Sequence, residues 1–216
     1  MKKRITLNEA VSKVQDGMTI MIGGFLGCGT PEGMIDALIE KDVKDLTIIC
    51  NDTSFVDKGL GKLVANKQVK KVITSHIGTN KETGRQMNAG ELEVVLVPQG
   101  TLAERVRAGG AGLGGVLTPI GLGTPVEEGK EKIEVNGKTF LLETAIKADV
   151  ALLHGSIVDE KGNVFYNQAT RNFNPLMATA AETVIVQAEK IVKAGELDPH
   201  LIMTPGLFVN YVVGEA

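Results

Sequence analysis

Short apolar runs and amphipathic stretches alternate along the chain. Runs rich in β-branched residues predict strands at residues 19–22, 46–50, 69–77, 92–97, 150–153 and 183–186. The segments between them space their apolar residues as helices do, and they predict helices at residues 7–14, 31–41, 102–107 and 175–182. Runs such as TIMI and VVLV are continuously apolar, which is typical of strands that helices cover on both faces. The pattern predicts an α/β fold with a mainly parallel open sheet flanked by helices.

One segment departs from this rhythm. In KIEVNGKTFLLE, residues 132–143, two strand-like runs flank Asn136-Gly137, the signal for a type I′ turn in a two-residue hairpin. We therefore expect residues of about 115–145 to form a small antiparallel insertion on the main sheet. Since no low-complexity linker and no internal repeat interrupts the chain, residues 1–216 are expected to form a single domain that carries this insertion.

Composition and charge narrow the class of protein. The 216 residues are 43% hydrophobic and 23% charged, and no stretch approaches the ~18 apolar residues that a membrane span needs, so no membrane partner is expected. A net charge of −3 without a basic stripe disfavours nucleic acid as a partner. The start, MKKRITLNEAVSKVQDG, has polar residues where a signal peptide needs an apolar core, which predicts a cytoplasmic location.

The cysteines and histidines give no sign of a metal centre. Cys28 and Cys50 lack CxxC spacing, so neither a disulfide framework nor a zinc site is expected. His76, His154 and His200 have no HExxH or i, i+4 spacing, and each is more easily explained as a surface or structural residue than as a metal ligand.

A glycine-rich turn stands out in IMIGGFLGCGTP, residues 20–31. The predicted strand gives way to four glycines, and Thr30 and Pro31 then suit the N-cap and first position of a helix. Without Cβ atoms such a turn can direct backbone N–H groups at an anion or a polarised carbonyl. Tight packing alone is the alternative explanation. The chain has no GxxxxGK[ST] motif, and GAGLGG at residues 110–115 follows a helical pattern, so neither a triphosphate loop nor a Rossmann site is predicted.

The segment DGMTIMIGGFLGCGTP, residues 16–31, resembles the first signature of the family I (3-oxoacid) CoA-transferases position by position. Further segments are similar to landmarks of the α subunit of that family: SHIGTN at residues 75–80, VPQGTL at 97–102, RAGGAG at 107–112 and RNFNP at 171–175. The likeness covers nearly the whole chain. It is greatest to bacterial α subunits that act on acetoacetate with acetate or butyrate, and it implies the open α/β sheet of the CoA-transferases and of sugar-phosphate isomerases.

The resemblance also implies a reaction and a partner. Family members move CoA from an acyl-CoA, such as acetoacetyl-CoA, to a free carboxylate, such as acetate or butyrate, through an acyl-glutamyl anhydride and a glutamyl-CoA thioester. The family's glutamate lies in a Ser-Glu-Asn-Gly motif of the β subunit, and that string is absent here. The chain is therefore expected to be inactive alone and to work with a β subunit in an α2β2 or α4β4 assembly. Acyl-CoA and short-chain carboxylates are its expected ligands, with CoA as a substrate and no permanently bound cofactor.

Two groups of residues are implied to form the site. Gln99, in PQGT, is implied to stabilise the oxyanion with its side-chain amide. Without the resemblance to the family, the preferred interpretation is that Gln99 caps a helix that starts at Thr101. The glycine loop (residues 23–29) is implied to line the acyl-CoA site, and its members are Gly23, Gly24, Phe25, Leu26, Gly27, Cys28 and Gly29. Within it Phe25 suits a core position equally well, and Cys28 is not expected to be a nucleophile.

The remaining candidates are open to more than one interpretation. Asn51 and Asp52 follow the LTIIC strand and are placed either to contact the substrate carboxylate or to cap a turn. Arg107 and Arg171 either bind CoA phosphates or pair with the partner subunit. At the level of the whole chain, the alternatives are a ligand-binding module of the same fold and a succinyl-CoA:3-oxoacid CoA-transferase α subunit. An adjacent reading frame that encodes Ser-Glu-Asn-Gly would favour a CoA-transferase.

Overall fold

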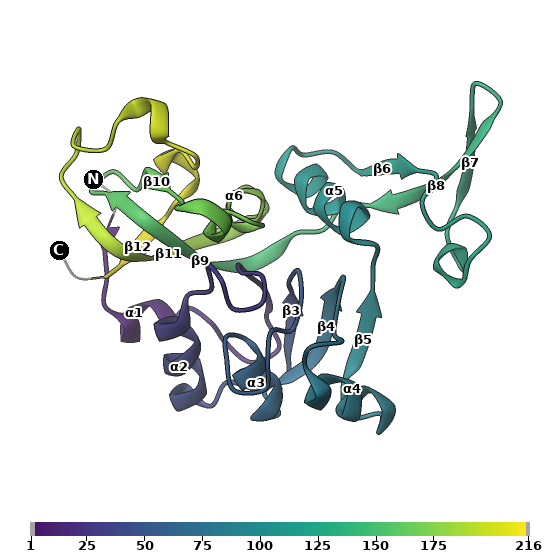
Figure 1. Ribbon diagram of the computed structural model, residues 1–216, viewed down its shortest axis with the longest axis horizontal. Coiled ribbons are helices and arrows are strands. Elements are labelled where there is room, and N and C mark those ends of the chain that lie inside the picture. Colours follow the sequence, from purple (N-terminus) through teal and green to yellow (C-terminus); the bar gives the residue numbers. More distant parts are fainter. Residues whose placement is uncertain (1–2, 215–216) are drawn as a thin grey trace.

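The computed structural model describes residues 3–214, and it has the α/β architecture that the sequence predicts (Figure 1). The strands of the main sheet are β1 (Lys3–Arg4), β2 (Thr19–Ile22), β3 (Leu46–Ile49), β4 (Val69–Thr74), β5 (Glu93–Leu96), β9 (Ala148–Asp159), β10 (Val164–Phe165), β11 (Ala181–Val192) and β12 (Tyr211–Val213). Their order is β1-β12-β11-β9-β2-β3-β4-β5, with every pair along this path parallel, and β10 pairs antiparallel with β9.

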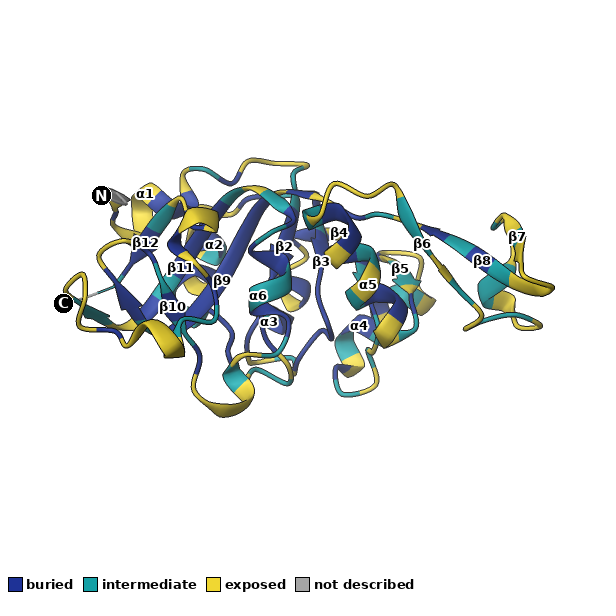
Figure 2. Ribbon diagram, turned by 90° about the horizontal axis from the view of Figure 1, so that it is seen from above, coloured by how far each residue is buried: buried dark blue, intermediate teal, exposed yellow. Residues whose placement is uncertain are grey.

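Helices cover both faces of this sheet. The helices are α1 (Leu7–Val11), α2 (Glu32–Lys41), α3 (Gly61–Ala65), α4 (Lys81–Asn88), α5 (Gln99–Gly110) and α6 (Asn174–Met177), with 3₁₀ turns η1 (Pro125–Glu127), η2 (Gln168–Thr170), η3 (Pro199–Leu201) and η4 (Gly206–Phe208). Successive residues of β2 face opposite sides, so Ile20 and Ile22 pack with α1, α2 and α3 while Met21 packs with α5 and α6. Burial on both faces explains why the strand sequences are continuously apolar (Figure 2).

Several element boundaries differ from the predicted ones. Strands β9 and β11 each run for 12 residues because they pair with one another well beyond the apolar runs that predicted them. The helix predicted at residues 175–182 ends at Met177, since β11 already begins at Ala181. Helix α5 begins at Gln99, earlier than predicted, and continues to Gly110.

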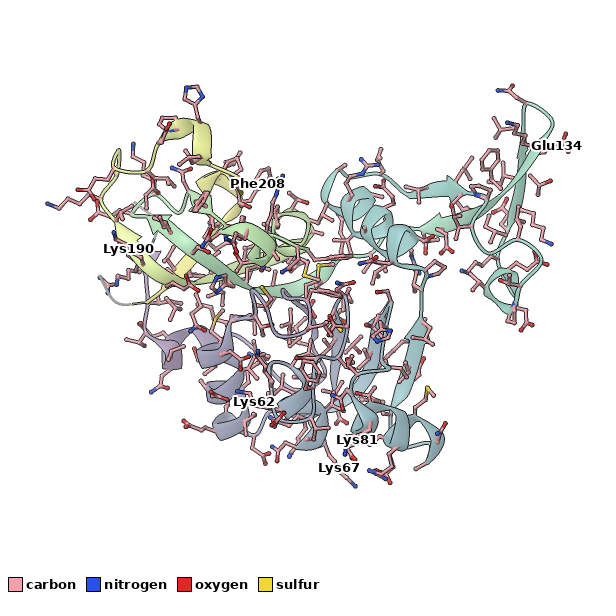
Figure 3. The ribbon with its side chains drawn as sticks, in the orientation of Figure 1. Lys62, Lys67, Lys81, Glu134, Lys190 and Phe208 are labelled. Carbon is pink, nitrogen blue, oxygen red and sulfur yellow. The ribbon has the colours of Figure 1, made fainter. Side chains whose placement is uncertain are left out.

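The insertion is an antiparallel sheet of its own. Its strands are β6 (Gly115–Thr118), β7 (Lys132–Val135) and β8 (Lys138–Thr144), in the order β6-β8-β7. Asn136 and Gly137 both have positive φ, 52° and 71°, as a type I′ turn requires. The sheet projects from the body, with Glu134 of β7 near its far end (Figure 3). The predicted antiparallel insertion is confirmed, although it is separate from the main sheet rather than part of it; the single-domain extent of the chain stays a prediction.

The strand order places a topological switch point beside the glycine loop. From β2 the chain moves through β3 and β4 to β5 on one side, and β9, β11 and β12 occupy the other side. Open α/β sheets bind ligands in the crevice outside the carboxyl ends of the strands at such a point. The glycine loop leaves the carboxyl end of β2 at this switch point, so it lies where the fold favours a site.

Membrane-spanning helices and metal-binding clusters are both absent from residues 3–214. None of the helices there is both long and apolar enough to cross a bilayer. Within the same residues no group of three or more His, Cys, Asp or Glu side chains is arranged to hold a metal ion.

Candidate functional site

The predicted site residues gather at one edge of the sheet. The glycine loop follows β2, Asn51 and Asp52 follow β3, and Gln99 follows β5. Because these strands are parallel, their carboxyl ends share one edge, and the arrowheads of β4 and β5 point toward α5 (Figure 1). Hydrogen bonds between side chains and loops then join segments that lie far apart in the sequence.

The tip of the glycine loop is a two-residue turn. Phe25 and Cys28 exchange backbone hydrogen bonds of 3.0 and 2.8 Å, and between them Leu26 and Gly27 have φ of 50° and 79°. Both central residues therefore adopt the left-handed conformation of a type I′ turn. Leucine is rarely found there, and its N–H is held by the Asp52 carboxylate, whose Oδ2 accepts it at 3.0 Å.

The base of the loop is clamped by the segment that precedes and opens α6. Asn172 accepts the Gly24 N–H at 3.1 Å and donates to the Cys28 carbonyl at 3.0 Å. Asn174, which is fully buried, donates to the Gly29 carbonyl at 3.0 Å. A Cβ atom on Gly29 would lie 2.5 Å from the backbone oxygen of Thr170. Thr170 and Asn172 thus pack so closely on the loop that only glycine fits at position 29.

Most backbone N–H groups of the glycine loop are used within the chain. The N–H groups of Gly23, Gly24, Phe25, Leu26 and Cys28 all donate within the chain. Among the described residues, the N–H groups of Gly27 and Gly29 have no acceptor; Gly29 is buried, and Gly27 is half-buried. Phe25 is 41% exposed at the tip, so the alternative of a core phenylalanine is wrong.

The predicted helix start is also wrong by one residue. The N-cap of α2 is Pro31 rather than Thr30, and the helix begins at Glu32. Thr30 is buried, and its side chain occupies the space beside Gly24 where a Cβ atom would otherwise sit. The Glu32 N–H is instead accepted by the backbone oxygen of Thr30 at 3.0 Å.

Gln99 belongs to a hydrogen-bond network that spans three loops. Its Nε2 donates to Oδ1 of the buried Asn51 at 3.1 Å, and Oγ of Ser75, which follows β4, lies 3.0 Å from the same oxygen. Ser75 Oγ is also 2.7 Å from the Asn51 backbone oxygen, so its proton is shared between two acceptors. Gln99 is exposed and is the first residue of α5, with Pro98 as the N-cap, so the alternative of a cap for a helix starting at Thr101 is wrong.

Asp52 caps a turn and holds the glycine loop. The residue is 2% exposed, and Oδ1 of its carboxylate accepts the Ser54 N–H at 2.6 Å while Oδ2 accepts that of Leu26. Burial raises the pKa of Asp52 above its ordinary value, and the two N–H donors and nearby His76 oppose that rise. With both oxygens engaged, Asp52 acts on the loop rather than facing an open site.

The other candidates do not join this network. Arg107 pairs with Glu104 on α5 at 2.6 Å, and both side chains are about half exposed. Arg171, His76 and His200 are exposed. The sequence analysis identifies SHIGTN and RNFNP only by their resemblance to the family. It does not predict that Ser75 contacts Asn51, or that Asn172 and Asn174 hold the glycine loop.

His154 is buried, and we expect it to make the fold sensitive to acid. It is 7% exposed, and its Nε2 lies 3.4 Å from Glu189 Oε1 without the geometry of a hydrogen bond. Burial lowers the pKa of His154, and Glu189 only partly opposes this. The unfolded chain therefore binds the proton more readily, and the free energy of unfolding should fall as the pH drops below ~6.5, by at most ~1.4 kcal/mol per pH unit. Urea unfolding at several pH values should show a shallower fall for His154→Leu.

The exposed His200 provides the control for that experiment. His200→Gln replaces an exposed imidazole outside the core and should keep the pH dependence of the original chain. Equal slopes for His154→Leu and the original chain would show that other groups cause the acid sensitivity.

The family model and the similar sequences all point to coenzyme A transferases. The model of the family "Coenzyme A transferase" matches residues 4–215. The chain is 57% identical over 213 residues to the acetoacetyl-CoA:acetate/butyrate CoA transferase alpha subunit of Clostridium acetobutylicum, covering 99% of this chain and 98% of that protein. It is 54% identical to the alpha chain of the acetate CoA-transferase of Escherichia coli, covering 98% and 96%. It is 48% identical to one of the chains of a succinyl-CoA:3-ketoacid coenzyme A transferase of Helicobacter pylori, covering 98% and 92%.

Solved structures share the fold. An acyl-CoA transferase of Escherichia coli, in a thioester complex with CoA, superposes with a TM-score of 0.87 at 24% identity over 99% of this chain. The chain spans only 47% of that protein, about half its length. Glutaconate coenzyme A-transferase of Acidaminococcus fermentans superposes with a TM-score of 0.85 at 23% identity, over 98% of this chain and 75% of that chain. These likenesses confirm the fold class that the sequence predicted.

Proposed function

Because the chain belongs to the coenzyme A transferase family, we propose that it is the α subunit of a heteromeric enzyme that moves CoA between acetoacetyl-CoA and free acetate or butyrate. The observation that carries the proposal is the 57% identity with an α subunit of that activity over 99% of the chain. The succinyl-CoA alternative has less support, with identities of 46–50%. The family match weighs against a ligand-binding module that acts without a partner.

The catalytic glutamate comes from the β subunit in this proposal, since the Ser-Glu-Asn-Gly motif is absent from the chain. Exposed aromatic side chains at the candidate site support a partner. Phe25 is 41% exposed on the glycine loop, and Phe55, on the loop after β3, is 38% exposed. Large exposed apolar side chains at a site rim are typical of a surface that another chain covers. The assembly is α2β2 or α4β4.

Gln99 serves the reaction as a neutral hydrogen-bond donor. When the glutamate carboxylate adds to the thioester carbonyl, a C–O bond forms and the carbonyl oxygen becomes an oxyanion. Breaking the C–S bond then releases CoA thiolate, which attacks the glutamyl carbonyl of the anhydride and displaces the acyl carboxylate, with no net proton transfer. Asn51 holds one N–H of the Gln99 amide, which leaves the second N–H free to donate to the oxyanion.

The glycine loop takes the acyl-CoA in this proposal, with CoA as a substrate that enters and leaves. Its half-buried tip offers the Gly27 N–H, which has no acceptor among the described residues. In this proposal Asn51 does not contact the substrate. It orients the Gln99 amide, which does. The cytoplasmic location expected from the sequence stays a prediction, which cell fractionation would check.

Co-expression with the β subunit tests the proposed function. The two chains would be purified through a tag on this chain alone and assayed for CoA exchange between acetoacetyl-CoA and acetate, butyrate or succinate. Activity with acetate or butyrate in the complex, and none in either chain alone, is the expected result. A preference for succinate would favour the alternative, and a chain that forms no complex would contradict the proposal.

Ser75→Ala should weaken the orientation of Gln99 without removing the donor. Loss of one shared hydrogen bond to Asn51 is worth ~1 kcal/mol, so we expect kcat of the complex to fall about fivefold with little change in KM for acetoacetyl-CoA. Ser75→Thr keeps the hydroxyl and should restore most of kcat. A higher KM with unchanged kcat would instead place Ser75 in direct contact with substrate.

A further inference from the structure

Strand β7 has an open edge at the far end of the insertion. The insertion sheet has the order β6-β8-β7, so β7 pairs with β8 on one side only. Along this strand Lys132, Glu134 and Val135 are exposed, and Ile133 is half-buried (Figure 2). The open edge of a strand presents unpaired N–H and C=O groups, which makes it a template for pairing with another strand.

The pairing of β7 with β8 determines which backbone groups point outward. The Leu142 N–H donates to the Glu131 carbonyl at 2.9 Å, so these two residues form a hydrogen-bonded pair. Such pairs alternate along antiparallel strands with pairs that exchange no hydrogen bonds. Ile133 therefore directs its N–H and C=O groups at β8, whereas Lys132 and Glu134 direct theirs away from it. No loop within residues 3–214 bonds to these outward groups.

One symmetric register lets the outward groups of two β7 strands meet without opposing like charges. When the strands pair antiparallel about a two-fold axis at Ile133, Lys132 of each copy lies opposite Glu134 of the other. Both are hydrogen-bonded pairs, and the two Ile133 side chains form the closely spaced pair between them. An axis at Lys132 or at Glu134 would place two like charges directly opposite each other, which is destabilising. An axis between two residues would set outward groups against inward ones.

Both charged side chains on this edge can make such contacts. Glu134 has no hydrogen bond or ion pair within residues 3–214. Lys132 pairs with Glu127 at 3.0 Å, but its side chain is 49% exposed, and an ammonium group has three donors. Charges on an edge strand usually prevent pairing with other strands. Opposite charges two positions apart therefore disfavour most strands and still accept a second copy of β7.

We propose that β7 pairs edge to edge with β7 of a second copy of this chain, in the antiparallel register centred on Ile133, and so joins two αβ pairs of the assembly. The proposal rests on the proposed function for the heteromeric assembly, and it assigns the contact between α chains to the insertion. A symmetric contact of this kind is complete with two copies. Glu134 lies near the far end of the projecting insertion, so the contact does not use the glycine loop (Figure 3).

Sedimentation of the complex with the β subunit, over a range of concentrations, tests this contact. Lys132→Glu and Glu134→Lys each place like charges opposite one another, so each variant complex is expected at about half the mass of the original complex. An equimolar mixture of the two variant complexes should return to the full mass, because each then supplies the charge that the other needs. The double variant Lys132→Glu/Glu134→Lys should keep the full mass without mixing.

Lys190→Glu is the matched control and should keep the full mass, since Lys190 is exposed on β11 at the opposite end of the molecule from Glu134 (Figure 3). The proposal would be overturned by full mass in both single variants, by half mass in their mixture, or by an original complex with one copy of each chain. Release of the β subunit by either variant would overturn it too, because β7 would then contact that subunit. A complex that responds to charge reversal as expected and yet transfers no CoA would refute the proposed function alone.

Discussion

Gln99→Ala is expected to lower kcat of the assembled enzyme on the order of 10²- to 10³-fold, the usual cost of removing one oxyanion donor. The amide is exposed at the site edge, and Asn51 fixes its orientation through the 3.1 Å hydrogen bond. Because the donor acts on charge that develops only in the transition state, KM for acetoacetyl-CoA should change little. Steady-state kinetics with acetoacetyl-CoA and acetate would measure both constants.

Two further variants make that result specific. Gln99→Glu keeps the shape but places a negative charge toward the oxyanion, so it should be at least as impaired as Gln99→Ala. Gln15→Ala, an exposed glutamine at the opposite edge of the sheet, should leave kcat unchanged. A Gln99→Ala complex that assembles and turns over normally would remove Gln99 from the mechanism.

Gly29→Ala is expected to destabilise the fold more than Gly90→Ala, although both glycines have φ of +70°. An alanine in the left-handed region costs about 1–2 kcal/mol at either position. At Gly29 the new Cβ atom would also lie 2.5 Å from the Thr170 backbone oxygen, whereas at Gly90 it would meet no atom within 4 Å. The clash should add about 1–3 kcal/mol to the loss of unfolding free energy at Gly29.

Denaturant unfolding of the two variants would give the difference directly. Activity of the complexes adds an independent measurement, because a displaced Gly29 also moves the loop tip while Gly90 lies far away, after α4. Equal losses of stability, with normal activity in both, would contradict the tight fit between the loop and the RNFNP segment.

The close contact between the glycine loop and the RNFNP segment explains why the chain has four glycines in seven residues. Of the two explanations, close packing is what the structure supports, and ligand binding by the loop stays a prediction. Gly29 faces a backbone oxygen, and Gly23 faces the side chain of Asn174, while the N–H groups of Gly27 and Gly29 have no acceptor in the described chain.

Local sequence patterns were enough to specify the fold class, the antiparallel insertion and most elements of the sheet. Continuously apolar runs predict doubly covered strands, and Asn136-Gly137 suits a turn that needs two positive φ angles. The motif that resembles the CoA-transferases also lies within one continuous segment, so it could be identified without coordinates. The family comparison agrees with it.

Which groups meet at the site depends instead on the tertiary fold. Gln99 and Asn51 are 48 positions apart, and Asn174 and Gly29 are 145 apart, so no local spacing predicts either contact. Both depend on strand order, which brings the carboxyl ends of β2, β3, β4 and β5 to one edge and sets α6 against the glycine loop. The boundaries that were wrong have the same cause: β11 starts where its pairing with β9 begins, and α2 starts one residue late because Thr30 packs against Gly24. Local hydrophobic patterns specify which residues are buried, whereas hydrogen-bond partners are specified by the neighbours that folding supplies.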